Sequence, residues 1–367
     1  MKKLVSVILM LAMLMSLAAV PAMAEGTTFG LTPLAQPATL RIGFFSGSAH
    51  SIPWYIADQM GFFKELNISV EYESFVNGPA MMEANASWDV CDVGGPGALN
   101  GMKNYGMYMI GEIDNEGNTA IFARPDSPIA KDPKNPEVWK GAVCILPLGT
   151  TLQHTLLSYL ISIGLTGADV QMTNMDVTSG LNAFKNGQGD VLCVWNAIAY
   201  NAEDSGFIRV SDAAQMGLNV TSTMCVTPSA LAEKRELVKT AWMVYYLTWD
   251  WCKQSEENMQ KAIELYVESC EDEGVVADES ICERALSIFA CPTPAEAVDL
   301  MTTLEKDRAA DGQVSRATND LFETLDFFIS VGNYAAADRA NVLDNGLVNG
   351  EIATECAETL KTLGYIK

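Results

Sequence analysis

The sequence predicts an α/β fold built as two lobes. Short strand-like runs alternate with helix-like segments of about a dozen residues in two series, a pattern typical of βαβ units with parallel strands. The first series begins at Leu40 and the second at Ala142. Single strands at 119–123 and 220–226 would carry the chain from one series to the other and back. Two lobes joined in this way enclose a cleft, and such clefts close around ligands by hinge motion.

The first series is marked by glycine- and proline-containing breaks between apolar runs. The strand at 40–45 ends at the small residues 46–50, and a helix follows at 54–64. The segment 68–72 is the next strand, and Gly78-Pro79 opens the next helix. The strand at 89–93 runs directly into Gly94-Gly95-Pro96-Gly97. We expect a further helix at 98–104 and a strand at 107–113.

The second series follows an irregular segment, 124–136, that contains four prolines. Its expected strands and helices alternate in the order 142–146, 152–163, 171–175, 179–186 and 191–195. After the return strand the chain is mostly helical, with helices expected at 237–253, 257–271, 280–289, 313–331 and 352–363. Five aromatic residues between Trp242 and Trp251 lie on the first of these helices, and we interpret them as core.

The length and these crossings give the domain prediction. A chain of 367 residues is long enough for two domains of ordinary size. We predict that lobe 1 is discontinuous, made of 39–122 and 224–367 with the C-terminal helices, and that lobe 2 is 123–223. We expect 25–38 to be a disordered tail.

The N-terminus has the features of a cleavable signal peptide. Lys2 and Lys3 precede an apolar core at 4–17, and a small-residue cleavage site ends at Ala24. The apolar core is shorter than the roughly 20 residues that a membrane span needs. We therefore expect export to a periplasmic or extracellular location, with cleavage after Ala24 and no stable membrane insertion. A formal charge of −23 argues against nucleic acid or an anionic membrane surface as partner.

The nine cysteines are scattered. No C-x-x-C pair is present, so the sequence gives no support for a zinc or dithiol site, and we expect neither metal nor cofactor. Four cysteines in the helical C-terminal region could form one or two disulfides, and Cys270 with Cys282 is the first candidate.

Candidate ligand-binding residues follow from the loops after the strands, because ligands of parallel sheets bind beyond the carboxyl ends of the strands. Thr150 and Thr151 after Gly149 open a helix, and a helix N-terminus preceded by glycine accepts an anion or a carbonyl oxygen. The equivalent loop of the first lobe contains small residues, His50 and the nearby Trp54; His50 could contact a ligand or be a solvated turn residue. Trp195 could stack on a planar ligand or pack structurally. The full set of candidates is Ser46, Gly47, Ser48, His50, Trp54, Gly95, Pro96, Asp114, Asn115, Gly149, Thr150, Thr151, Trp195 and Asn196.

The charge of the ligand is constrained by two observations. Arginine and lysine are nearly absent from these loops, so no bidentate arginine clamp for a carboxylate is visible. The segment 112–118 contains Glu112, Asp114 and Glu116, which favours a cationic or amine-bearing guest unless the segment is merely a solvated edge. We expect a small organic solute with a polar or ionised head and an apolar or aromatic body.

The chain also resembles the substrate-binding proteins of ABC importers for nitrate, sulfonates, taurine and thiamine precursors. The resemblance covers roughly 40–249 and rests on the order of these blocks: 40–44, 54–57, 61–64, 77–80, 92–94, 139–141, 149–151, 183–184, 189–190 and 194–195. It implies a type II periplasmic-binding-protein architecture, an anion-contacting loop at Gly149–Thr151 and an ABC permease as partner for a monomer. Relatives often have Trp-Asp where this chain has Trp195-Asn196, which removes a negative charge from the cleft.

Other functions are weaker alternatives. The sequence contains no Gly-x-Ser-x-Gly, Gly-Lys-Ser/Thr or His-Glu-x-x-His motif, and we expect no catalytic residues. The thiamine-pyrimidine synthase shares this fold family, but it is intracellular and has a cysteine-rich cluster. A ligand-binding lobe of a membrane sensor remains a third alternative.

Overall fold

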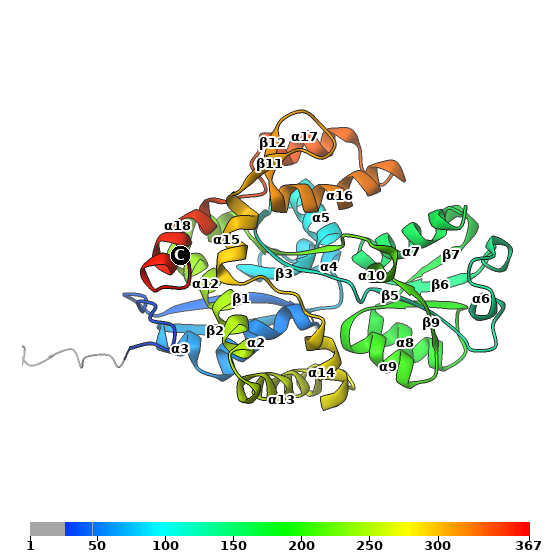
Figure 1. Cartoon of the computed structure of the whole chain (residues 1–367), viewed down its shortest axis with the longest axis horizontal. Coiled ribbons are helices and arrows are strands. Elements are labelled where there is room, and N and C mark those ends of the chain that lie inside the picture. The colour runs from blue at the N-terminus through cyan, green and yellow to red at the C-terminus, as the bar shows by residue number, and fades with distance from the viewer. Residues whose placement is uncertain (1–25, 46) are drawn as a thin grey trace, which may run out of the picture.

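The computed structural model describes residues 26–45 and 47–367 and forms two α/β lobes (Figure 1). The sheet of the first lobe has the strand order β2-β1-β3-β10-β4. Strands β1, β2 and β3 are parallel, and β10 runs antiparallel to both of its neighbours. The bounds are β1 Ala38–Phe45, β2 Ile68–Phe75, β3 Val90–Gly94, β4 Tyr108–Asn115 and β10 Thr221–Val226.

The sheet of the second lobe repeats this pattern in the order β7-β6-β8-β5-β9. Here β6, β7 and β8 are parallel, and β5 is the antiparallel strand. The bounds are β5 Ala120–Ala123, β6 Val143–Leu146, β7 Gln171–Asn174, β8 Val191–Val194 and β9 Ile208–Asp212. The two-lobed α/β prediction is confirmed, and each lobe receives its antiparallel strand directly after a chain crossing.

The crossings lie before the residues that we predicted. Strand β5 pairs with β8 and β9 along its whole length. All four of its residues are buried in the second lobe. Strand β10 likewise pairs with β3 and β4 from Thr221 onward. The lobe boundaries predicted after Phe122 and before Met224 therefore cut through strands, and the connections lie at 116–119 and 217–220 instead.

Helices cover both sheets. In the first lobe they are η1 Ala49–Ser51, α2 Ile52–Gln59, α3 Phe62–Glu65, α4 Gly78–Glu83 and α5 Gly95–Tyr105. In the second lobe they are α6 Pro128–Lys131, η2 Pro136–Val138, α7 Thr151–Ser162, η3 Gly167–Asp169, α8 Val177–Lys185, α9 Asn196–Asp204 and α10 Ala213–Met216. The helix predicted at 54–64 is interrupted, because Gly61 adopts a left-handed conformation (φ 80°) between α2 and α3.

The C-terminal region wraps the first lobe and reaches the second (Figure 1). Its elements are α11 Pro228–Glu233, α12 Arg235–Lys253, α13 Glu256–Asp272, α14 Glu279–Ser287, α15 Pro294–Thr302, β11 Leu304–Lys306, β12 Gln313–Ser315, α16 Arg316–Ser330, α17 Ala336–Asp344 and α18 Glu351–Thr362. Helix α12 packs its aromatic residues into the core, as predicted: Trp242 is fully buried and its indole N–H donates to the carbonyl of Ile110. Helices α14 and α16 contact α9 and α7 of the second lobe.

The segment 26–37 is packed rather than disordered. Phe29 is buried and its ring lies 4.8 Å from that of Phe62, and Leu31 is also buried. The backbone N–H of Thr28 donates to Glu65. Burial of two apolar side chains explains why the prediction of a tail was wrong here. The predicted signal peptide and its cleavage site lie outside the described residues.

Two further properties bear on the predictions. All nine cysteines are buried free thiols, so the Cys270–Cys282 disulfide is not formed in this structure. Within 26–45 and 47–367, none of the helices combines the length and apolar character that a membrane crossing requires.

Candidate functional site

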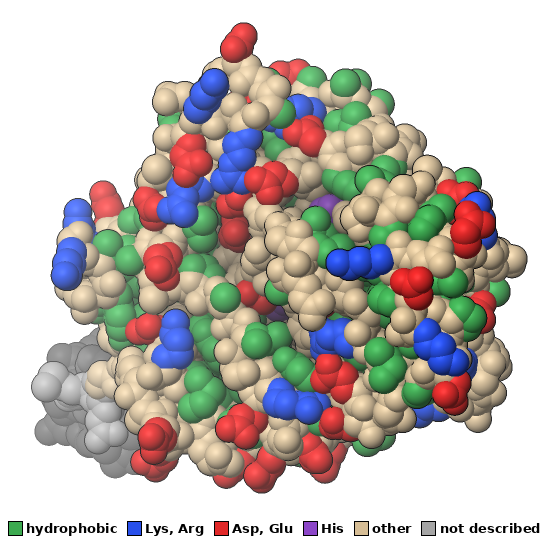
Figure 2. All heavy atoms as spheres, turned by 45° about the vertical axis from the view of Figure 1, so that its right-hand side comes forward, with side chains coloured by type: hydrophobic (Ala, Val, Ile, Leu, Met, Phe, Trp, Pro, Cys, Tyr) green, Lys and Arg blue, Asp and Glu red, His purple; other side chains and the backbone are tan. Residues whose placement is uncertain are grey.

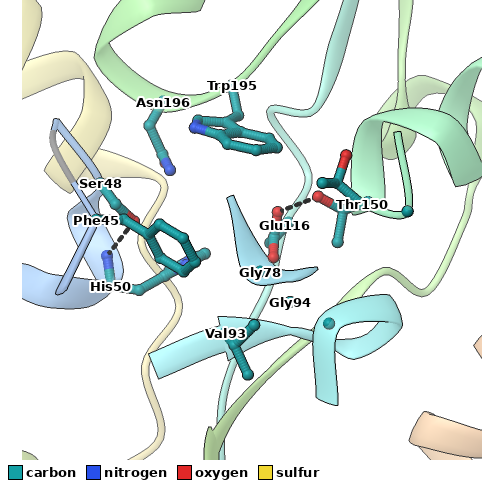
Figure 3. A pocket seen from close by; sticks show the side chains of 13 residues that line it. Phe45, Ser48, His50, Gly78, Val93, Gly94, Glu116, Thr150, Trp195 and Asn196 are labelled. Atoms are coloured by element: carbon teal, nitrogen blue, oxygen red, sulfur yellow. Dashed lines mark hydrogen bonds between the residues drawn. The ribbon is translucent and has the colours of Figure 1, made fainter. Parts of the chain in front are cut away.

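A pocket of about 390 Å³ lies between the two lobes (Figure 3). Most of its walls come from the loops that follow the carboxyl ends of four parallel strands: β1 and β3 of the first lobe, and β6 and β8 of the second. Gly78, after β2, and Glu116, after β4, complete it. This is the position at which parallel sheets bind ligands. The lining residues are Phe45, Ser48, His50, Gly78, Val93, Gly94, Gly97, Glu116, Gly149, Thr150, Thr151, Trp195 and Asn196.

Four helices begin at this pocket. Helix α4, which starts at Gly78, is capped by the Asn77 side chain. The other three are α5, α7 and α9, and their N-cap residues are Gly94, Thr150 and Trp195. Within the described residues, no side chain makes a capping hydrogen bond at any of the three; the Thr150 hydroxyl instead donates to the carbonyl of Pro147. The first turn of a helix carries unpaired N–H groups and a partial positive charge. The pocket is therefore electropositive in its backbone.

The Glu116 carboxylate lies at the centre of the pocket (Figure 3). Its Oε1 accepts a hydrogen bond of 2.6 Å from Ser222, and its Oε2 accepts one of 2.8 Å from Thr151. Burial raises the pKa of Glu116, while the charge of His50 and the two hydroxyl groups lower it. Because Ser222 belongs to the first lobe and Thr151 to the second, this carboxylate connects the lobes at a crossing.

The His50 imidazole lies between a hydroxyl group and a carboxylate. Its Nδ1 lies 3.1 Å from Ser222 Oγ, and its Nε2 lies 3.5 Å from Asp114 Oδ2. Since the Ser222 hydroxyl already donates to Glu116, Nδ1 donates to Ser222. Burial opposes the charge, but the hydrogen bond with Asp114 and the charges of Glu116, Asp114 and Asp92 raise the pKa of His50 to about 9. His50 is thus protonated at neutral pH.

Two glycines allow the lobes to meet beside the pocket. A Cβ on Gly94 would lie 2.6 Å from Thr151 Cγ2 and 2.8 Å from Glu116 Oε1. Gly149 has φ +72°, a left-handed conformation that favours glycine, and a Cβ there would lie 3.1 Å from Pro79. These contacts join the two lobes, so the structure represents a closed form.

Asn196 is held in an unusual conformation. Its φ of 46° is one of two positive values among the described non-glycine residues, and its carbonyl accepts a hydrogen bond of 3.3 Å from Asn118. Such backbone strain persists where the surroundings fix it, which happens most often at functional sites. Trp195 and Asn196 both line the pocket (Figure 3).

A family model described as NMT1/THI5 like matches residues 48–258. The chain belongs to the NMT1/THI5-like family. No curated protein matches its sequence.

Solved structures share the fold of this NMT1/THI5-like protein at low sequence identity. The alkanesulfonate-binding protein SsuA from Xanthomonas axonopodis pv. citri, bound to MOPS, is 18% identical with a TM-score of 0.64, covering 82% of this chain and 95% of that one. The periplasmic nitrate-binding protein NrtA from Synechocystis PCC 6803 is 14% identical with a TM-score of 0.65, covering 90% of each chain. The desulfurization enzyme DSZB, in a mutant form with biphenyl-2-sulfinic acid, is 13% identical with a TM-score of 0.60, covering 89% and 100%.

Seven predicted site residues of this family member come together at the pocket: Ser48, His50, Gly149, Thr150, Thr151, Trp195 and Asn196. His50 is buried, which rules out the solvated-turn alternative. Asp114 lines an adjoining cavity of about 260 Å³ together with Asn118 and Phe289, on the other side of Trp195.

Five predicted residues do not line the pocket. Trp54 lies on the inner face of α2 with its ring 4.6 Å from that of Tyr245, because helical periodicity turns it into the core. Asn115 accepts from the backbone N–H of Val220. The three others are backbone positions just beside lining residues: Gly47 faces Val275, Gly95 faces Thr221, and Pro96 occupies the first turn of α5. Ser46 lies outside the described residues.

Six lining residues were not among the predicted set: Phe45, Gly78, Val93, Gly94, Gly97 and Glu116. Gly94 and Gly97 keep the glycine spacing of the resembling family, so a sequence signal existed for them. Glu116 was recognised only as part of an acidic segment. Nothing in the sequence distinguishes it from Glu112, which is half-buried and does not line the pocket.

Proposed function

We propose that this protein captures a small organic solute in the interlobe pocket, outside the cytoplasmic membrane, and delivers it as a monomer to an ABC import permease. The observation that carries this proposal is that the loops after four parallel strands, two from each lobe, line one pocket. The fold shared with sulfonate- and nitrate-binding proteins supports it.

The lobe contacts explain how a solute would act on the conformation. In this structure Thr151 donates to Glu116, and a Cβ on Gly149 would lie 3.1 Å from Pro79, so both contacts cross from the second lobe toward the first. A ligand that touches both lobes binds the closed form better than the open one. It therefore shifts the equilibrium toward the closed form, by an amount set by the difference between its binding free energies for the two forms. A permease can recognise the closed form.

An enzyme is the second candidate for two reasons. DSZB shares the fold, and the His50 ring contacts Asp114 through one nitrogen and Ser222 through the other, as in a catalytic triad. The electrostatics oppose such a triad. With its pKa raised to about 9, His50 carries both protons at neutral pH and cannot accept one from Ser222. Ser222 is fully buried and donates to Glu116. No cysteine is among the described lining residues, so a thiol nucleophile has no support either.

A thermal-shift screen of the purified protein tests the proposal. Sulfonates, carboxylates, amines, nucleobases and thiamine precursors are tried in turn, and a binder raises the unfolding midpoint by mass action. Hits are followed by calorimetry with Thr150→Ala and Trp195→Ala. Thr302→Ala is the control, because its hydroxyl also donates to a backbone carbonyl but lies at the exposed end of α15, away from the pocket lining. Saturable binding that the pocket variants lose supports the carrier; turnover of a hit supports the enzyme.

The thiamine-pyrimidine synthase alternative predicts turnover in this screen. The sensor alternative predicts the same binding with a different membrane partner, and co-purification with a permease would separate the two.

A further inference from the structure

We propose that Glu116 is a built-in anion that fills the anion-binding position of the pocket, so that the solute carries a protonated nitrogen rather than a sulfonate, nitrate or carboxylate group. This inference rests on the proposed function and names the charge class of its solute. It is carried by three features of the pocket: its electropositive backbone, the place of Glu116 within it, and the charges around it.

The backbone of the pocket would otherwise suit an anion. The first turns of α5, α7 and α9, of 11, 12 and 9 residues, converge there without side-chain caps. The His50 cation follows β1 of the first lobe and lines the same pocket. Several helix N-termini together with a cation are a common way to bind anions.

That position is already occupied by the chain itself. The Glu116 carboxylate accepts from the Thr151 hydroxyl at the start of α7 and from Ser222, which also contacts His50. A Cβ on Gly94, the N-cap of α5, would lie 2.8 Å from Glu116 Oε1, so the carboxylate also touches the start of that helix. A second anion at this place would meet a fixed negative charge in a low-dielectric setting.

The remaining charges point the same way. No lysine or arginine is among the described lining residues. Asp114 and Asp92 lie close enough to His50 to raise its pKa, so acidic groups outnumber the one cation. The pocket therefore offers no unpaired positive side chain to an anionic solute.

Glu116 has hydrogen-bonding capacity left for a solute. A carboxylate accepts about four hydrogen bonds, and two sites are used by Ser222 and Thr151. The others are available to N–H donors of a guest. The rings of Trp195 and Phe45 border the same space (Figure 3), and aromatic faces attract cations. An ammonium or amidinium group would find a carboxylate and an aromatic wall together.

The surface charge does not by itself indicate which solute charge the pocket prefers. Acidic and basic side chains are mixed over the visible face (Figure 2). The charge preference is thus a property of the pocket, and surface charge alone would not reveal it.

The test compares probes of one shape and opposite charge. Benzylamine and benzamidine are titrated against benzoate and benzenesulfonate by calorimetry, using wild type, Glu116→Gln and Glu116→Asp. Wild type and Glu116→Asp are expected to prefer the cations, whereas Glu116→Gln loses at least tenfold in cation affinity and gains at least tenfold for benzenesulfonate. Glu116→Ala replaces Glu116→Gln if circular dichroism shows that the latter does not fold.

Two results would overturn the inference. One is saturable binding of benzenesulfonate or benzoate to wild type. The other is a Glu116→Gln or Glu116→Ala variant whose affinity for both anions is no higher than that of wild type, whether or not wild type binds the cations. Wild type that binds sulfonates from the screen would leave the proposed carrier standing while removing the charge assignment. Absence of any binder in the whole screen would instead remove the proposed function.

Discussion

The Thr151 hydroxyl of the second lobe donates a 2.8 Å hydrogen bond to the Glu116 carboxylate, where the chain leaves the first lobe. Hydrogen bonds to charged groups contribute more than neutral ones, about 1.5–3 kcal/mol. Because this bond joins the second lobe to the connection that leaves the first, we expect its energy to favour closure rather than the folding of either lobe.

Replacing Thr151 with valine should therefore favour the open form. We expect a larger radius of gyration in X-ray scattering without ligand and a solute affinity about tenfold weaker. Thr362→Val is the matched control, since that hydroxyl bonds within α18. Unchanged scattering and affinity in Thr151→Val would show that the bond does not govern closure.

Gly94→Ala should have a similar effect for a steric reason. The new methyl group would lie 2.6 Å from Thr151 Cγ2, well inside van der Waals contact, and the second lobe would have to move away. We expect at least a tenfold loss of affinity with the fold kept, as measured by calorimetry and circular dichroism. Gly26→Ala, where nothing lies within 4 Å, is the control. Equal affinity in the two variants would contradict the closed arrangement.

The sequence predicted the lobes and most of the pocket because both depend on local patterns. Strand and helix alternate with clear breaks, and parallel strands place their following loops at one edge. Ser48, Thr150 and Trp195 were chosen on this basis, and all three line the interlobe pocket. The rest depends on the three-dimensional arrangement: Trp54 follows a helical period into the core, and Glu116 reaches the pocket only because β4 ends at Asn115.

The missed helix α15 had a visible signal. Thr293 and Glu296 form a capping box with a proline at the first helical position. By contrast, the packing of 26–37 had none, because two apolar residues in a polar segment are not a pattern.

His50 should make stability depend on pH on the alkaline side. Its folded pKa of about 9 exceeds the unfolded value of 6.5. The stabilisation is therefore complete below pH 6.5 and is lost as the pH rises through 9. At about 1.4 kcal/mol per pKa unit, it amounts to about 3 kcal/mol. Urea unfolding of wild type and His50→Gln from pH 6 to 10 should show the loss in wild type only. Parallel curves would argue against a charged His50.

His154 should act in the opposite direction. It lies on α7 with its ring 4.2 Å from that of Phe327 on α16, and burial lowers its pKa to about 4. The unfolded chain then binds the proton more readily, so stability falls as the pH drops from 6.5 through 4. His154→Phe should flatten this acid limb in urea unfolding. A limb of the same slope in the variant would place the sensitivity elsewhere.

A calorimetric titration of wild type and Trp195→Ala with the solute found in the screen tests the interlobe binding site. We expect one binding site per chain, and an affinity at least tenfold weaker in the variant with unchanged thermal stability of the free protein. Equal affinity in the two proteins would contradict this expectation, because the solute would then bind outside the pocket between the lobes.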